Sequence, residues 1–328
     1  MRSADQELIV LAAPRDGDAY YAEVVDDIFD FHIAFARQIL AHDDLVLILV
    51  DEGSYADYVE ALNEDVVLIA PQDDIWMRDF GLVNPQRPLM FRYTAEGQSG
   101  GRSGQRDADA VQETLAELLE EAGLAFYSSD VLNDGGNFVD DDVGRAVVSR
   151  KFLRDNELNE TEARELLFDL AEIEHLAFIE SDEQGGLEHA DGVAAFIEPG
   201  VLLVNAYTDD PDYVAELRTD LLAGLPDVQI HELVAPYDGS RIYDEKFGSA
   251  CGLYTNMLVT PNRIYLPQFG IPQDGKAIAS LRQWTEKEIV PVQSGMICAM
   301  GGGVRCMSMQ LRGENAARLL SSAQAPGN

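Results

Sequence analysis

The sequence predicts a continuous α/β protein, and three observations support that prediction. Short apolar runs alternate with longer segments of helical periodicity along the whole chain. Hydrophobic residues make up 46% and aromatic residues 8% of the 328 residues, which is typical of a folded protein with a sizeable core. No linker rich in proline and serine divides the chain. We therefore predict a single domain over residues 1–328, although length alone is compatible with two.

Three short apolar runs near the beginning of the chain predict buried strands. Each is rich in leucine, isoleucine or valine and is followed by turn residues. They lie at residues 7–14, 45–52 and 66–71.

Several longer segments predict helices. Residues 107–123 have aspartates at their beginning, leucines at helical spacing and Gly123 at their end. Asn159 and Glu162 have the spacing of a capping box, which predicts a helix over 161–176. The remaining helix candidates are residues 19–42, 210–224, 275–288 and 313–322.

Segments marked by glycine or aspartate follow apolar runs at nearly even intervals. They centre on Asp79, Gly135, His189, Gly252 and Cys306, at separations of 56, 54, 63 and 54 residues. Even spacing indicates a repeated αβ unit, and each copy of the unit would place one loop at a common point. The segments share no obvious sequence, and any α/β protein also places loops at the ends of its strands.

The charge balance excludes some classes of partner. The chain has 59 acidic against 23 basic residues, a formal net charge of -36. Nucleic acids and anionic membranes require basic patches, so we expect neither as a partner. The acidic surface either attracts cationic substrates or keeps the protein soluble in concentrated salt, and we prefer the second explanation.

The cysteines and the amino terminus predict a reduced, cytoplasmic protein. Cys251, Cys298 and Cys306 do not form a disulfide framework. The first residues lack the pattern of a secretory leader, and no apolar stretch is long enough to span a membrane. A homo-oligomer is compatible with the sequence.

Cys306 is the candidate nucleophile. It follows Gly301 to Gly303 and Arg305, and such glycines allow close backbone approach and present a thiol on a tight turn. The cationic Arg305 could lower the thiol pKa. The alternative is a buried structural cysteine beside a turn, which is our interpretation of Cys251 and Cys298.

His189 and Asp191 are the candidate acid–base pair. In extended backbone, residues two apart face the same side, so the imidazole and the carboxylate would project together. A metal site is the rival interpretation. We expect no metal, since the chain has five histidines and none of the usual paired ligand spacings.

Two further segments carry polar side chains after predicted strands. Trp76 and Asp79 could stack on and pair with a planar cation, or Arg78 and Asp79 could simply hold a loop together. Asn137 follows a pair of glycines in a turn with a polar tip. No nucleotide-binding glycine motif is present, and we expect no cofactor.

At these positions the chain resembles the guanidine-modifying (pentein) superfamily, in particular agmatine deiminases and Porphyromonas-type peptidylarginine deiminases. Five motifs in the family's order carry the resemblance from about residue 66 to the end: WMRDFG (76–81), GGNF (135–138), HAD (189–191), IYLPQFG (264–270) and GGGVRC (301–306). The resemblance implies one catalytic domain, a five-bladed pseudo-symmetric α/β propeller, which agrees with the interval of roughly 55 residues. It also implies a role in polyamine biosynthesis.

The resemblance implies a covalent mechanism on a small cationic guanidinium substrate. Asp79 and Asp191 would clamp the guanidinium, and Cys306 would attack its central carbon. His189 would protonate the departing ammonia and then activate water to release a ureido product. Trp76, Asn137 and Arg305 complete the implied substrate-binding set. A resonance-stabilised cation is a poor electrophile, which suits a thiol nucleophile with acid assistance.

The chain departs from the agmatine enzymes at three places. Arg305 stands where they have a histidine, and RCMSM (305–309) is more similar to arginine deiminases. Leu187 and Glu188 replace an Asn-Gly pair, and the amino-terminal Trp-Pro stretch is missing. These departures bear on recognition of the far end of the substrate.

Agmatine is the first substrate hypothesis. Arginine, a carboxyl-terminal peptidyl arginine or another guanidino compound would undergo the same chemistry, and an amidinotransferase would pass the intermediate to an amine. A non-catalytic guanidinium-binding propeller is the alternative from another class. An unrelated cysteine amidase or protease fits the carboxylate-rich segments less well.

Overall fold

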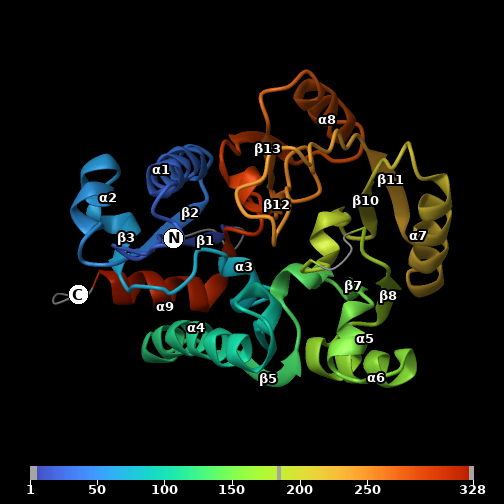
Figure 1. The fold of residues 1–328 in the computed structure, drawn as a ribbon, viewed down its shortest axis with the longest axis horizontal. Helices are drawn as coiled ribbons and strands as arrows, with labels where there is room; N and C mark the ends of the chain where they lie inside the picture. Colours follow the sequence, from blue (N-terminus) through green and yellow to red (C-terminus); the bar gives the residue numbers. More distant parts are fainter. Residues whose placement is uncertain (1–5, 183–185, 325–328) are drawn as a thin grey trace.

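The strands of the protein form five separate sheets within residues 6–182 and 186–324, the part of the chain that the computed structural model describes (Figure 1). The first sheet has the order β15–β1–β2–β3, with β1 Leu8–Ala12, β2 Leu45–Val50, β3 Val67–Ile69 and β15 Met309–Leu311. The others contain β4 Leu89–Arg92 and β5 Tyr127–Leu132; β6 Val139–Asp140, β7 Arg145–Ser149 and β8 His175–Ile179; β9 Ala194–Glu198, β10 Val201–Asn205 and β11 Gln229–Leu233; β12 Leu258–Val259, β13 Arg263–Gln268 and β14 Glu288–Gln293.

All five sheets share one pairing pattern. A central strand pairs antiparallel with one neighbour and parallel with the other, as β1 does with β15 and β2. The same holds for β7, β10 and β13 in their sheets. In the remaining sheet β4 is parallel to β5, and the antiparallel partner is reduced to a bridge between Val83 and Leu89. A repeated αβ unit is what the even loop spacing predicts.

Helices connect the parallel strands of each sheet, as chain reversal between parallel strands requires. These crossover helices are α1 Val25–Ala41, α2 Tyr55–Ala61, α4 Gly101–Glu121, α5 Lys151–Asp155 with α6 Glu160–Ala171, α7 Pro211–Gly224 and α8 Gln273–Leu281. The other α-helices of the described residues are α3 Met77–Phe80 and α9 Gly313–Ala323. None of the helices in the described residues is long and apolar enough to cross a membrane.

Both faces of the first sheet are covered, which explains why β1 is apolar at every position. Its residues alternate between two cores, since successive side chains of a strand point to opposite faces. Ile9 and Leu11 pack with the buried face of α1, whereas Leu8 and Val10 pack with α4 and α9 (Figure 1).

The α/β class and the strand predictions are confirmed, and the helix bounds differ in instructive ways. The Asn159 capping box forms and begins α6, but the helix ends at Ala171 because Glu172 adopts a left-handed conformation (φ 50°). His175, predicted within that helix, begins β8 instead. The first helix begins at Val25 rather than residue 19; turns precede it, and the Tyr21 hydroxyl there donates to Asp74 at 2.8 Å.

Candidate active site

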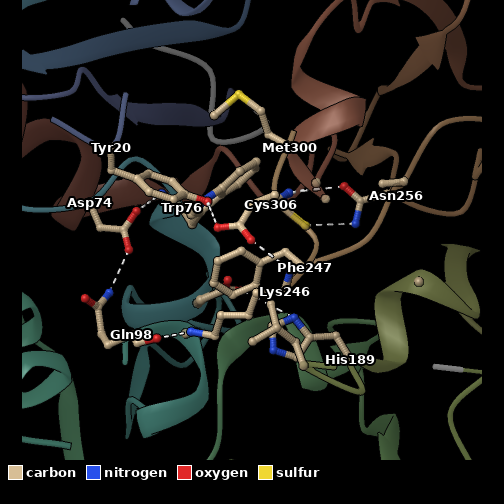
Figure 2. Close-up of a pocket in the computed structure, with 18 of the residues that line it drawn as sticks. Tyr20, Asp74, Trp76, Gln98, His189, Lys246, Phe247, Asn256, Met300 and Cys306 are labelled. Atoms are coloured by element: carbon tan, nitrogen blue, oxygen red, sulfur yellow. Dashed lines mark hydrogen bonds and ion pairs between the residues drawn. The ribbon is translucent and has the colours of Figure 1, made fainter. Parts of the chain in front are cut away.

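Five of the predicted site residues line one cavity of about 480 Å³: Trp76, Asp79, His189, Asp191 and Cys306 (Figure 2). They come from segments far apart in sequence. Asp79 lies on α3, His189 directly precedes the short helical turn Ala190–Gly192, which contains Asp191, and Cys306 follows the glycine run. The structure therefore brings together a thiol, an imidazole, two carboxylates and an indole.

The Cys306 sulfur is buried and held by an asparagine that sequence reasoning missed. The Asn256 amide donates to Sγ at 3.0 Å, and its oxygen accepts from the Cys306 backbone N–H at 3.2 Å (Figure 2). The Cys306 carbonyl accepts from the Arg78 backbone N–H at 3.0 Å. Cys306 is thus held by contacts from two segments, and it is only 7% exposed.

Two glycines before Cys306 are required by close packing. A Cβ on Gly302 would lie 2.1 Å from the Trp76 ring, and one on Gly303 would lie 2.7 Å from the Asn256 side-chain oxygen. Real Cβ atoms do not approach that closely, so glycine allows both the indole and the amide to reach the nucleophile's loop.

His189 lies between two buried carboxylates. Its Nε2 is 2.9 Å from Asp134, and its Nδ1 is 3.7 Å from Asp79. Burial alone would lower the pKa of His189, but the charges of Asp79 and Asp134 outweigh burial and raise the pKa to about 9. The ring is therefore an imidazolium near neutral pH, which suits a general acid.

Asp134 is a second site residue that the sequence analysis did not single out. Besides His189, it accepts hydrogen bonds from the Thr94 backbone N–H at 2.8 Å and the Thr94 hydroxyl at 2.9 Å. Burial raises its pKa, but the hydrogen bond and charge of His189 lead the effects that bring the pKa below its usual value. Its position directly before Gly135 was the available signal.

Asp79 is poised for a cationic ligand. Its Oδ1 is buried and has no hydrogen-bond partner. Burial is the main cause that raises the pKa of Asp79; the neighbouring His189 cation opposes the rise, and Asp134 and Asp191 add to it. A buried carboxylate oxygen without a donor carries a desolvation cost that a guanidinium N–H would relieve.

The predicted lowering of the thiol pKa by Arg305 is wrong for this site. Burial, followed by the charges of Asp191 and Asp79, raises the pKa of the Cys306 thiol well above its usual value. The physical reason is direction: the Arg305 guanidinium points to Asp191, at 2.6 Å, and to the Phe138 carbonyl, at 2.9 Å.

Asn137 and Arg305, both predicted to bind substrate, do not line the cavity that holds Cys306. Asn137 is buried and accepts from the backbone N–H groups of Ser149 and Ala190, so it supports the turn that carries His189. Arg305 lines a second cavity of about 320 Å³. Their roles in substrate binding remain predictions.

Four more carboxylates line the cavity, from Asp18, Asp73, Asp74 and Asp244. Among the described lining residues, Lys246 is the one lysine or arginine; it donates to the Gln98 carbonyl and its Nζ lies 4.4 Å from the Phe247 ring centre (Figure 2). A cavity whose charged lining residues are mainly aspartates concentrates cationic ligands.

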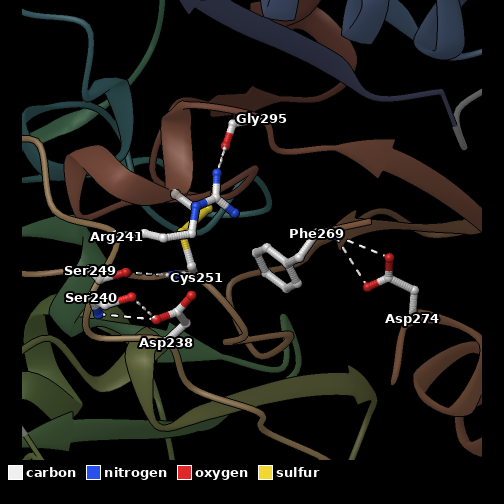
Figure 3. Close-up of a disulfide and its surroundings, with 9 residues drawn as sticks. Asp238, Ser240, Arg241, Ser249, Cys251, Phe269, Asp274 and Gly295 are labelled. Atoms are coloured by element: carbon white, nitrogen blue, oxygen red, sulfur yellow. Dashed lines mark hydrogen bonds between the residues drawn. A yellow bond between two sulfur atoms is a disulfide. The ribbon is translucent and has the colours of Figure 1, made fainter. Parts of the chain in front are cut away.

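Cys251 and Cys298 form a disulfide, which corrects the prediction that all three cysteines are reduced (Figure 3). Chain packing brings the two together across 47 residues, and the Ala250 backbone N–H donates to the Cys298 carbonyl at 2.8 Å. The disulfide joins two segments that line the cavity, at Ser249 and Met300. Cys306 remains the free thiol. The cytoplasmic location stays a prediction.

The part of the chain that is described contains no cluster of three or more histidine, cysteine or acidic side chains arranged to hold a metal ion.

Solved structures with the same fold define the class of protein. An agmatine deiminase from C. jejuni superimposes with a TM-score of 0.74 at 18% identity, covering 94% of each chain. A DDAH from Pseudomonas aeruginosa superimposes with a TM-score of 0.55 at 14% identity, covering 93% of this chain and 98% of that one. The fold is thus the mixed α/β fold of the pentein superfamily.

The Porphyromonas-type peptidyl-arginine deiminase family model matches residues 3–311, and the chain belongs to this family. Two curated relatives, each named "Putative agmatine deiminase", are 27% identical to it. The relative from Selenomonas ruminantium aligns over 87% of this chain and 88% of its own length, and the relative from Shewanella baltica over 80% of each. The resemblance stated from the motifs is confirmed.

Proposed function

We propose that this protein is a guanidine iminohydrolase that converts agmatine to its ureido product and ammonia. The carrying observation is the convergence of Cys306, His189 and two carboxylates on one cavity, where the Asp79 Oδ1 lacks a donor. Agmatine as substrate is supported by the names of the relatives and by the excess of carboxylates in the cavity, because agmatine carries a second positive charge.

In the proposed mechanism, Asp79 and Asp191 bind the guanidinium N–H groups through charge-assisted hydrogen bonds. This neutralises the two charges that raise the thiol pKa of Cys306, so the thiol ionises more easily once substrate is bound. The thiol proton passes to solvent and the thiolate sulfur attacks the guanidinium carbon. His189 then gives a proton to one guanidinium nitrogen, so that its C–N bond breaks and ammonia leaves. Water activated by the neutral His189 then attacks the thiouronium carbon, and the sulfur departs with the ureido product released.

Arginine or a carboxyl-terminal peptidyl arginine is the second candidate substrate, and Lys246 is the observation that favours it. Its ammonium lies at the same cavity and could bind a carboxylate at the far end of the substrate. Asp18, Asp73, Asp74 and Asp244 would repel that carboxylate. We therefore place agmatine first.

We also propose that the five sheets are the blades of a closed α/β propeller formed by one catalytic domain. The shared pairing pattern supports this arrangement, as does the pairing of β15 with β1, which joins the two ends of the described chain. The small cationic guanidinium partner and any homo-oligomer remain predictions.

The test is incubation with agmatine, arginine, a peptide ending in arginine and methylated arginines, with ammonia and ureido product measured for wild type and Cys306→Ala. We expect turnover of agmatine by wild type and none by the variant. Binding without turnover by wild type would favour the non-catalytic propeller. Full activity in Cys306→Ala would overturn the assignment of the nucleophile, and transfer to an added amine would indicate an amidinotransferase.

A further inference from the structure

Consecutive residues of the nucleophile's loop face two different cavities. Cys306 lines the cavity of the proposed active site, whereas Arg305 lines the second cavity together with Arg78, Lys287 and Arg312. The Arg305 side chain is only 12% exposed, so it is held within the wall between the two.

The Arg305 guanidinium has two fixed acceptors on that wall. One Nη donates to Asp191 Oδ2 at 2.6 Å, and the other donates to the Phe138 carbonyl at 2.9 Å. The backbone is fixed too, since the Arg305 N–H donates to the Asn256 carbonyl at 3.2 Å. The bond to the Phe138 carbonyl fixes the planar guanidinium, so its other Nη meets Asp191 from one defined direction, which a flexible cation would not provide.

The paired oxygen is the one that faces the nucleophile. Asp191 Oδ2 lies 3.9 Å from the Cys306 sulfur, and the Asp191 side chain is 2% exposed. An unpaired carboxylate at that depth would be costly, and nothing would hold it in one orientation. Arg305 is therefore the counter-ion of the Asp191 carboxylate. Because it binds Oδ2, it leaves Oδ1 for a ligand.

We propose that Arg305 is a positioning residue that acts through Asp191, holding this carboxylate in one orientation as an ion pair so that it can bind a guanidinium. The proposal rests on the proposed function in naming the ligand. It also replaces substrate contact as the role of Arg305, because Arg305 does not line the cavity that holds Cys306. Asp191, Asp140 and Arg78 are charged neighbours of the Arg305 guanidinium. Of these three, Asp191 alone lines the cavity that holds Cys306.

A double-mutant cycle tests the coupling without any substrate. Urea unfolding is measured for wild type, Arg305→Gln, Asp191→Asn and the double variant. Arg305→Gln should lower the unfolding midpoint, and the same substitution should have little effect in the Asp191→Asn background. Equal effects in both backgrounds would overturn the proposal.

Steady-state kinetics distinguish a role of Arg305 in positioning Asp191 from a role in protein stability alone. With agmatine, Arg305→Gln should raise KM at least tenfold and change kcat less, because Asp191 is no longer held in its binding orientation. Arg305→Lys, which keeps the charge, should stay within a few-fold of wild type. Lys287→Gln removes a cation from the same second cavity without touching Asp191 and should leave KM unchanged.

The two arms fail separately. If no guanidino compound is turned over by wild type, the proposed function fails and the unfolding cycle still decides the role of Arg305. If agmatine is turned over and Arg305→Gln has the wild-type KM, the positioning role is wrong while the proposed function stands.

Discussion

Replacing Asp134 by asparagine removes the charge that His189 contacts most closely. The 2.9 Å contact joins a buried imidazolium to a buried carboxylate, and a hydrogen bond to a charged group contributes about 1.5–3 kcal/mol. One pKa unit corresponds to about 1.4 kcal/mol, so the loss should lower the pKa of His189 by about 1–2 units. From about 9 in the wild type, the pKa should fall to about 7–8 in Asp134→Asn, by the same conversion.

The sign of the effect follows from the role of His189 as an acid. The proposed first step needs the imidazolium, so activity is retained below the His189 pKa and lost as pH rises through it. The alkaline limb of kcat/KM for agmatine should therefore move to lower pH in Asp134→Asn. The contribution of the ion pair to stability has the same sign: it is full below the pKa of an unfolded histidine, near 6.5, and is lost as pH rises through about 9.

Histidine NMR titration measures the shift directly, with His189→Gln identifying the resonance among the five histidines. Thr94→Val and Thr94→Ser form the matched pair, because only the valine variant loses the hydroxyl bond to Asp134. The valine variant should shift the titration less than Asp134→Asn, and the serine variant should not shift it. An unchanged His189 titration in Asp134→Asn would refute the reasoning.

The other predictions concern the clamp, the glycine run, the disulfide and the charge. Asp79→Asn should reduce kcat/KM for agmatine at least a hundredfold, since it removes a charged partner worth roughly 3 kcal/mol; near-normal kinetics would remove Asp79 from the clamp. Gly302→Ala should displace the Trp76 ring, 2.1 Å from the new Cβ, and cost about 1–3 kcal/mol in denaturant unfolding. Cys251→Ser, which opens the bond to Cys298, should cost about 2–4 kcal/mol in the same assay. Activity and refolding should improve with KCl concentration, and full activity in dilute buffer would contradict the salt explanation of the acidic surface.

Two controls bound these predictions. Gly275→Ala places a Cβ in open space on α8 and should not destabilise the protein. If it destabilised as much as Gly302→Ala, the steric argument would be wrong. A thiol reagent should label one cysteine per chain in denaturant without reductant and three after reduction. Three labelled cysteines without reductant would show that the disulfide is absent.

The sequence predicted the parts of the site that carry a local signal. Cys306, His189 and Asp79 stand beside glycines or at the ends of apolar runs, so their neighbours mark them. Asn256 has no such mark, because its role depends on a contact with a residue 50 positions away. The orientation of Arg305 was missed for a similar reason: sequence adjacency to Cys306 says nothing about which side of the loop a side chain faces.

The fold shows the same division. Burial on both faces made β1 and β2 recognisable as continuous apolar runs. The end of α6 depends on one left-handed residue, Glu172, which the apolar pattern does not reveal. The Cys251–Cys298 pair depends on how two loops pack, and no spacing rule connects cysteines 47 residues apart.

The pairing of β1 with β15 has a consequence for how the protein is made. Val10 pairs with Met309, 299 positions later in the chain, so the first sheet stays incomplete until residue 309 has left the ribosome. Contacts of such long sequence separation form slowly, and the apolar β1 strand must remain uncommitted during synthesis. The last strand also begins three residues after Cys306, so completion of the first sheet and placement of the nucleophile are one late event. A nascent chain arrested before residue 309 would then be both inactive and the form most exposed to aggregation.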